Sequence, residues 1–146
     1  MQPQPRSAAA DSQTDYERMV DAFHHAFDDQ PVEAMTADLL RLRKTLIEEE
    51  VRELFAEMDA AIAALDAGQP VPKPTFLNML KETADVQYVL SGMSVKFGWP
   101  IGAVFARVHE SNMSKLGEDG RPVRRPDGKV LKGPRYHPPV LDDLVI

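Results

Sequence analysis

The strongest constraint on the fold is a run of apolar residues at helical spacings of three and four between residues 36 and 67. Thr36 is a typical helix N-cap residue, and Gly68 is a typical C-terminal stop. The pattern therefore predicts one long helix whose stripe is Leu39, Leu40, Leu42, Leu46, Ile47, Val51, Leu54, Phe55, Met58, Ile62 and Leu65.

Three further segments carry helical signals. Residues 15–27 have apolar residues at the same spacings, and Pro31 follows them. A third helix is expected to open at Thr75 and to close at Gly98. A fourth is expected over residues 101–114, with a proline in its first turn. Together the four segments predict an all-α, four-helix body.

Glycine and proline recur after Lys115 and exclude a long helix there. The pair Asp127-Gly128 favours the turn of a small hairpin. We therefore expect a disordered leader over residues 1–13, a helical domain over 14–115, and an irregular basic tail over 116–146 that belongs to the same domain.

The second and third predicted helices are apolar around much of their circumference. Helices of this kind usually bury one face against their own chain and another against a partner. The pattern favours a homodimer. The alternative is a monomer with a large core.

Composition limits the available chemistry. The chain has no cysteine, so disulfides and thiolate metal sites are excluded, and carboxylate ligands favour hard cations such as Mg²⁺ or Mn²⁺. The net charge is −6, of which residues 115–135 carry +4 and the rest −10. An acidic body argues against a nucleic-acid polymer as partner. No apolar signal-peptide core or membrane span is visible in the sequence, so we expect a cytoplasmic protein without a membrane partner.

Acidic residues lie inside the two long predicted helices. Glu49 and Glu53 are four residues apart, and Glu50 and Glu53 three apart, so they share a helix face. Glu82 and Asp85 are likewise three apart. Such runs are most often solvated faces. However, like charges at these spacings destabilise a helix unless a cation offsets them, and antiparallel packing would join the two groups into an oxygen-rich metal pocket.

The pattern Glu49-Glu50-x-x-Glu53 followed by Glu82-x-x-Asp85 resembles that of the MazG-like all-α NTP pyrophosphatases. This superfamily includes dimeric dUTPases and phosphoribosyl-ATP pyrophosphohydrolases. The pair Phe23-His24 also resembles this superfamily. So do three longer segments: LRLRKTLIEEEVRE, VFARVHESNMSK and DGRPVRRPDGKVLKGPRYHPP. One departure is Asp28-Asp29, which stands where a glycine is expected.

The resemblance implies that Glu49, Glu50, Glu53 and Asp85 hold Mg²⁺, with Mn²⁺ as a substitute, and that Glu82 fills the remaining metal position. A metal of this kind neutralises phosphate charge and acidifies a bound water, which then attacks the α-phosphorus. Either Glu49 or Glu50 is the candidate general base, and the sequence does not choose between them.

The resemblance also implies a nucleotide pocket. Lys115 is assigned to a phosphate, Asn112 to base, sugar or phosphate, and His24 to a pocket contact. Lys115 and Asn112 each have a structural alternative, a helix-end cation and a helix-end hydrogen bond respectively. The tail residues Arg125, Lys129 and Tyr136 are candidates to close over the phosphates, or else to pack across the partner subunit.

The function implied is a pyrophosphohydrolase that cuts a nucleoside triphosphate between its α and β phosphates. The leading substrates are dUTP or a non-standard dNTP, in cleaning of the nucleotide pool. One alternative is phosphoribosyl-ATP hydrolysis in histidine biosynthesis. Another is a non-catalytic helical interaction module.

Overall fold

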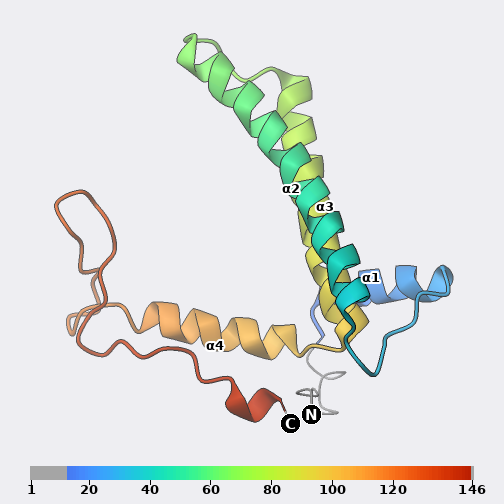
Figure 1. Ribbon diagram of the computed structural model, residues 1–146. Helices are drawn as coiled ribbons and strands as arrows, with labels where there is room; N and C mark the ends of the chain where they lie inside the picture. The colour runs from blue at the N-terminus through green and yellow to red at the C-terminus, as the bar shows by residue number, and fades with distance from the viewer. Residues whose placement is uncertain (1–12, 146) are drawn as a thin grey trace. The chain divides into compact units, whose positions relative to one another are not determined.

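The computed structural model describes residues 13–145, so the predicted leader lies outside the described residues except for Gln13. The described chain contains the helices α1 (Asp15–Ala26), α2 (Ala37–Asp66), α3 (Lys73–Phe97) and α4 (Ile101–Met113), followed by the short 3-10 helix η2 (Asp142–Leu144) (Figure 1). This confirms the predicted all-α class. The helices belong to two compact units, residues 14–98 and residues 99–145.

The unit of residues 14–98 is a helical hairpin with a third helix against it. Figure 1 shows α2 and α3 side by side, and the short connection between them makes the pair antiparallel. α1 packs on α3, where the Phe23 ring meets the edge of Tyr88 with 5.7 Å between centroids. The antiparallel hairpin brings the middle of α2 against the first half of α3.

Local sequence accounts for the helix ends. The Thr14 side chain accepts from the backbone N–H of Glu17, whose carboxylate accepts in return, so α1 opens with a capping box. Thr36 caps α2 as predicted, through a 3.2 Å bond from the N–H of Leu39. Gly98 has a positive φ of 62° and terminates α3 as predicted.

The predicted start of α3 is wrong by two residues. The helix begins at Lys73, not Thr75, and Pro74 lies in its first turn. Proline fits there because the N–H groups of the first helical turn have no partner within the helix.

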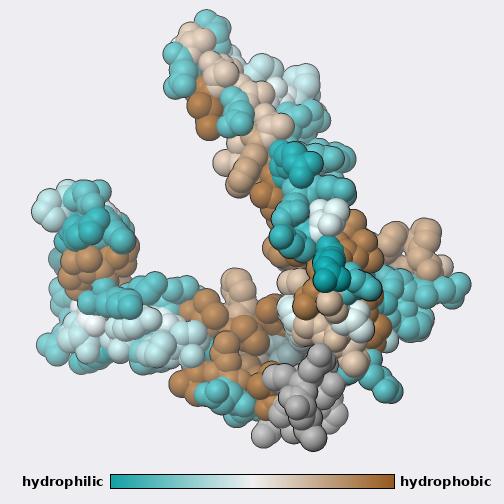
Figure 2. Space-filling view, in the orientation of Figure 1, coloured by the Kyte–Doolittle hydropathy of each residue, from teal (hydrophilic) through white to brown (hydrophobic). Residues whose placement is uncertain are grey.

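Much of the apolar surface of the α2–α3 pair is exposed within the single chain. Few apolar side chains of this unit are buried, among them Val20 and Phe97. Figure 2 shows hydrophobic residues gathered along α2 and α3 between hydrophilic ones. The large exposed side chains on these two helices include Leu42, Phe55, Met58, Ile62, Leu65, Phe76, Leu77 and Leu80.

The unit of residues 99–145 joins α4 to the tail. The Ser111 hydroxyl donates to the carbonyl of His137 at 2.8 Å, and Arg107 forms a two-armed ion pair with Asp143. The predicted turn at Asp127-Gly128 is present, with Gly128 at φ 86°. Its flanks form only the isolated bridge between Arg124 and Val130, so the hairpin is short.

Among residues 13–145, no single helix is long and apolar enough to cross a membrane. The pair α3 and α4 meets the length and hydropathy of a span only when both helices are counted together across the break between them.

Candidate metal and nucleotide site

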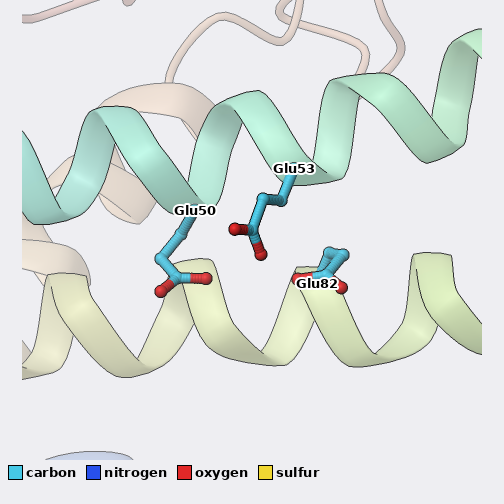
Figure 3. Close-up of side chains that lie close together, drawn as sticks. All are labelled: Glu50, Glu53 and Glu82. Atoms are coloured by element: carbon cyan, nitrogen blue, oxygen red, sulfur yellow. The ribbon is translucent and has the colours of Figure 1, made fainter.

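Three carboxylates meet between α2 and α3. Glu50 and Glu53 project from adjacent turns of α2 because they are three residues apart, and Glu82 faces them from α3 (Figure 3). One oxygen from each lies within 4.8 Å of the others. Glu82 is buried and Glu53 is exposed, so this acidic triad extends from the interior of the helix pair to its surface.

Asp85 and Lys81 adjoin the acidic triad on α3. The Lys81 ammonium donates to Asp85 Oδ2 at 2.7 Å and lies 3.1 and 3.3 Å from the two carboxylate oxygens of Glu82. Lys81 therefore links the predicted ligands Glu82 and Asp85.

The electrostatics of the triad show uncompensated negative charge. Burial raises the pKa of the Glu50 carboxyl, and the neighbouring carboxylates of Asp85, Glu53 and Glu82 raise it further. Hydrogen bonds to Asp85 and Glu82 raise the pKa of Lys81. The Lys81 ammonium pairs with two of these four acidic groups, Glu82 and Asp85.

The triad fits a hard divalent cation. Its donors are all carboxylate oxygens, the ligands that Mg²⁺ and Mn²⁺ prefer. Oxygens in one Mg²⁺ shell lie up to about 4.2 Å apart, so small side-chain rotations from the 4.8 Å spread suffice. A cation there would also offset the repulsion that raises the pKa of Glu50. Glu49, predicted as a ligand or base, is exposed and is not part of the triad.

The loop between α1 and α2 is held by an ionic cluster of one half-buried carboxylate and two buried cations. Asp29 accepts from Lys96 at 2.5 Å and from Arg43 at 3.2 Å, and both cations are buried. The ammonium of Lys96 also donates to the carbonyl of Gln30. Asp28 has φ 57°, a left-handed conformation that favours glycine. Asp28, which stands where a glycine is expected from the sequence, thus occupies a backbone position suited to glycine. Aspartate is among the residues that tolerate this left-handed conformation.

His24 is buried beside this cluster. Its Nδ1 lies 3.8 Å from Asp29 and has no hydrogen-bond partner in the described chain. Burial lowers the pKa of His24, and the nearby cations Arg43 and Lys96 act in the same direction, while Asp29 opposes them. The ring packs so close to Gly92 that a Cβ there would lie 3.5 Å from Nε2.

The other predicted nucleotide contacts lie in the unit of residues 99–145. The Lys115 ammonium donates to the Asn112 side chain at 2.8 Å. Arg125 pairs with Asp127, and Lys132 lies 4.4 Å from the centre of the Tyr136 ring. The backbone N–H of Lys129 donates to Asp127 at 3.1 Å.

Two features of the site were missed by the sequence reasoning. Lys81 is four residues before Asp85, and this helical spacing is a readable sign of an ion pair. The cluster around Asp29 offered no such sign, because Arg43 and Lys96 are distant from it in sequence.

The described chain is all-α, and its facing carboxylates form an acidic cluster that can take a metal ion. Residues 16–112 match the family described as "Phosphoribosyl-ATP pyrophosphohydrolase", and the chain belongs to that family, within the MazG-like superfamily. The matched range includes the triad, Asp85 and Asn112. It ends before Lys115 and the tail.

A solved structure described as a "putative NTP pyrophosphohydrolase" from Exiguobacterium sp. 255-15 is similar at 27% identity. The alignment covers 87% of this chain and 90% of the other, with a TM-score of 0.42. A search of curated proteins gives no match. The family assignment rests on the match over residues 16–112.

Proposed function

We propose that this pyrophosphohydrolase requires a divalent metal and cleaves a nucleoside triphosphate between its α and β phosphates, releasing a monophosphate and pyrophosphate. The observation that carries the proposal is the meeting of Glu50, Glu53 and Glu82 across α2 and α3 within the family-matched range. The preferred substrate is dUTP or a non-standard dNTP, which gives the enzyme a role in cleaning the nucleotide pool.

In this proposal Glu50, Glu53, Glu82 and Asp85 hold Mg²⁺ or Mn²⁺, and Glu49 is the fifth candidate ligand. The bound cation supplies charge neutralisation on the phosphates and a more acidic water. The helices keep the carboxylates fixed, since the backbone of α2 and α3 is hydrogen-bonded along its length. Glu49 or Glu50 accepts the proton of the attacking water.

The two candidate bases are separable by experiment. A ligand change weakens metal binding, whereas removal of a base that is not a ligand lowers turnover and leaves metal affinity unchanged. Because Glu49 lies outside the triad, Glu49→Gln is the informative variant. If it loses both metal affinity and turnover, Glu49 is a ligand.

The nucleotide contacts remain the predicted ones: His24, Asn112, Lys115, Arg125, Lys129 and Tyr136. We also propose that the tail over residues 116–146 works with residues 14–115 as one domain. The contact that supports this joins the tail to α4, where the Ser111 hydroxyl donates to the carbonyl of His137.

A homodimer is the proposed assembly. Apolar side chains exposed on α2 and α3 support it, as does an apolar groove of about 620 Å³ between α1 and α3, lined by Met19, Leu80 and Tyr88 among others. A second copy covering these surfaces would remove them from water.

The function test is pyrophosphate release from dUTP, each standard dNTP and NTP, and phosphoribosyl-ATP, with and without Mg²⁺ or Mn²⁺. Metal-dependent release from dUTP or another dNTP supports the proposal, with Glu53→Gln as the inactive control. Release from phosphoribosyl-ATP alone would establish the second candidate function, which the family description favours. Pyrophosphate release without metal, or by Glu53→Gln, would overturn the proposed metal site.

A further inference from the structure

Lys81 is a cation built into the proposed metal site. Its side chain is largely exposed, yet its ammonium reaches the buried carboxylate of Glu82. Both carboxylate oxygens of Glu82 lie within 3.3 Å of the Lys81 nitrogen, and Asp85 Oδ2 lies 2.7 Å from it. The ammonium therefore contacts both carboxylate oxygens of Glu82 and one of Asp85, three of the oxygens that these residues would offer to a metal.

No other cation shares this role in the described chain. Among the ion pairs of residues 13–145, Lys81 is the one cation paired with Glu82 or Asp85, and none is paired with Glu50 or Glu53. The arrangement leaves the four carboxylates with a single positive charge. An ammonium and a divalent cation repel each other and need the same oxygens, so the gain of one favours the loss of the other.

We propose that Lys81 is the internal counter-ion of the metal-free site and competes with the divalent cation for Glu82 and Asp85. The proposal rests on the metal site proposed above. In the metal-free protein the ammonium stabilises the buried carboxylate of Glu82. Metal binding requires its release, so Lys81 weakens metal affinity. Lys81 is thus a positioning residue that sets the metal concentration at which the site fills.

The experiment is calorimetric titration of the full chain with Mn²⁺, without nucleotide. Lys81→Met keeps an unbranched, flexible side chain one atom shorter than lysine and removes the charge. We expect it to bind Mn²⁺ more tightly than the unmodified protein, by a factor between about two and five, the range that follows from losing an ion pair whose lysine is largely exposed. Lys81→Gln is a second neutral variant in case the first does not fold.

Two matched controls accompany these variants. Lys81→Arg keeps the positive charge and should leave Mn²⁺ affinity close to that of the unmodified protein. Lys44→Met removes an exposed lysine that pairs with Glu48 at 3.5 Å on α2, outside the triad, and should also leave the affinity unchanged.

Thermal unfolding gives a readout that a purely structural ion pair would not produce. Without metal, Lys81→Met should melt below the unmodified protein because Glu82 loses its partner. At saturating Mn²⁺ the deficit should shrink or reverse. An ordinary helix-surface pair would give the same deficit in both conditions.

The outcomes separate the two proposals. If the unmodified protein binds Mn²⁺ and both neutral variants bind it equally or more weakly, the competition is refuted and the metal site stands. If no form binds Mn²⁺, both the metal site and the role of Lys81 are refuted. Tighter binding by the neutral variants alone, with the controls unchanged, supports both.

Discussion

Replacement of Glu50 by glutamine should stabilise the metal-free protein and weaken the metal-bound one. Glu50 has one carboxylate oxygen within 4.8 Å of oxygens of Glu53 and Glu82. At that distance two unit charges repel by about 0.9 kcal/mol in a water-like dielectric, which suits this partly exposed group. Lys81 offsets part of the repulsion from the two neighbours. We therefore expect Glu50→Gln to raise the unfolding free energy without metal by about 1 kcal/mol at pH 7.

The pH dependence follows from the raised pKa of Glu50. A carboxyl with a higher pKa in the folded state than in the unfolded state favours folding when protonated. That contribution is fully present below the ordinary value of 4.5 and is lost as the pH rises through the folded-state pKa. The advantage of Glu50→Gln should therefore be present at neutral pH and absent below 4.5.

Bound metal reverses the order of stability of the unmodified protein and Glu50→Gln. At a free metal concentration of 100 times Kd, binding adds about 2.7 kcal/mol to the stability of the unmodified protein. If loss of one charged ligand weakens binding a hundredfold, the gain at the same concentration falls to about 0.4 kcal/mol. Glu50→Gln is then the more stable protein without metal and the less stable one with it.

Urea unfolding of both proteins, with EDTA and with Mg²⁺ or Mn²⁺, measures all four free energies. Glu48→Gln is the matched control, since Glu48 lies on the same helix, pairs with Lys44 and is outside the triad. It should leave the metal-induced gain unchanged. Two results would refute the reasoning. One is a metal-free Glu50→Gln protein that is less stable than the unmodified one at pH 7. The other is an equal increase in unfolding free energy on adding metal to both proteins.

Three further predictions follow from the loop and the exposed apolar surface. Asp28→Gly should raise the unfolding free energy by up to about 1 kcal/mol because φ 57° strains a residue with a Cβ; a lower midpoint in urea would contradict this. Asp29→Asn should cost about 2 kcal/mol because it leaves the buried cations of Arg43 and Lys96 without their counter-charge. Since hydrogen bonding to Lys96 lowers the pKa of Asp29, its contribution is present above 3.8 and is lost as the pH falls through the lower folded-state pKa, so the variant and the unmodified protein should converge in acid. Phe76→Glu should shift the proposed dimer to monomer in sedimentation, with unchanged helix content by circular dichroism; a dimer that persists places the interface elsewhere.

Helical periodicity predicted the helices well because it depends on the spacing of apolar residues within one element. Thr36 and Gly98 define helix ends through backbone geometry that depends on a few neighbouring residues, so they were correctly placed. The triad was predictable for the same reason: Glu50 and Glu53 share a face by spacing alone, and antiparallel packing of adjacent helices needs only the short loop.

The cluster around Asp29 was not predictable in this way. Its partners Arg43 and Lys96 come from two different helices, and each reads as an ordinary surface cation in the sequence. Their burial depends on how the loop after α1 returns across α3, where the N–H of Val32 donates to the carbonyl of Lys96. Such contacts depend on tertiary packing, which spacing does not report.

Lys115 and Arg125, two of the proposed phosphate-binding cations, share an arrangement. Lys115 bonds to Asn112, and Arg125 pairs with Asp127, so each already has a partner within its own unit. Exposed pairs of this kind contribute at most about 1 kcal/mol. They can therefore hold these side chains in place without strongly opposing exchange for a phosphate, which offers a more highly charged acceptor. Lys81 differs because one of its acceptors, Glu82, is buried. Exchange there leaves a buried carboxylate that needs another cation, so release of Lys81 is coupled to metal binding, whereas exchange at Lys115 or Arg125 is not.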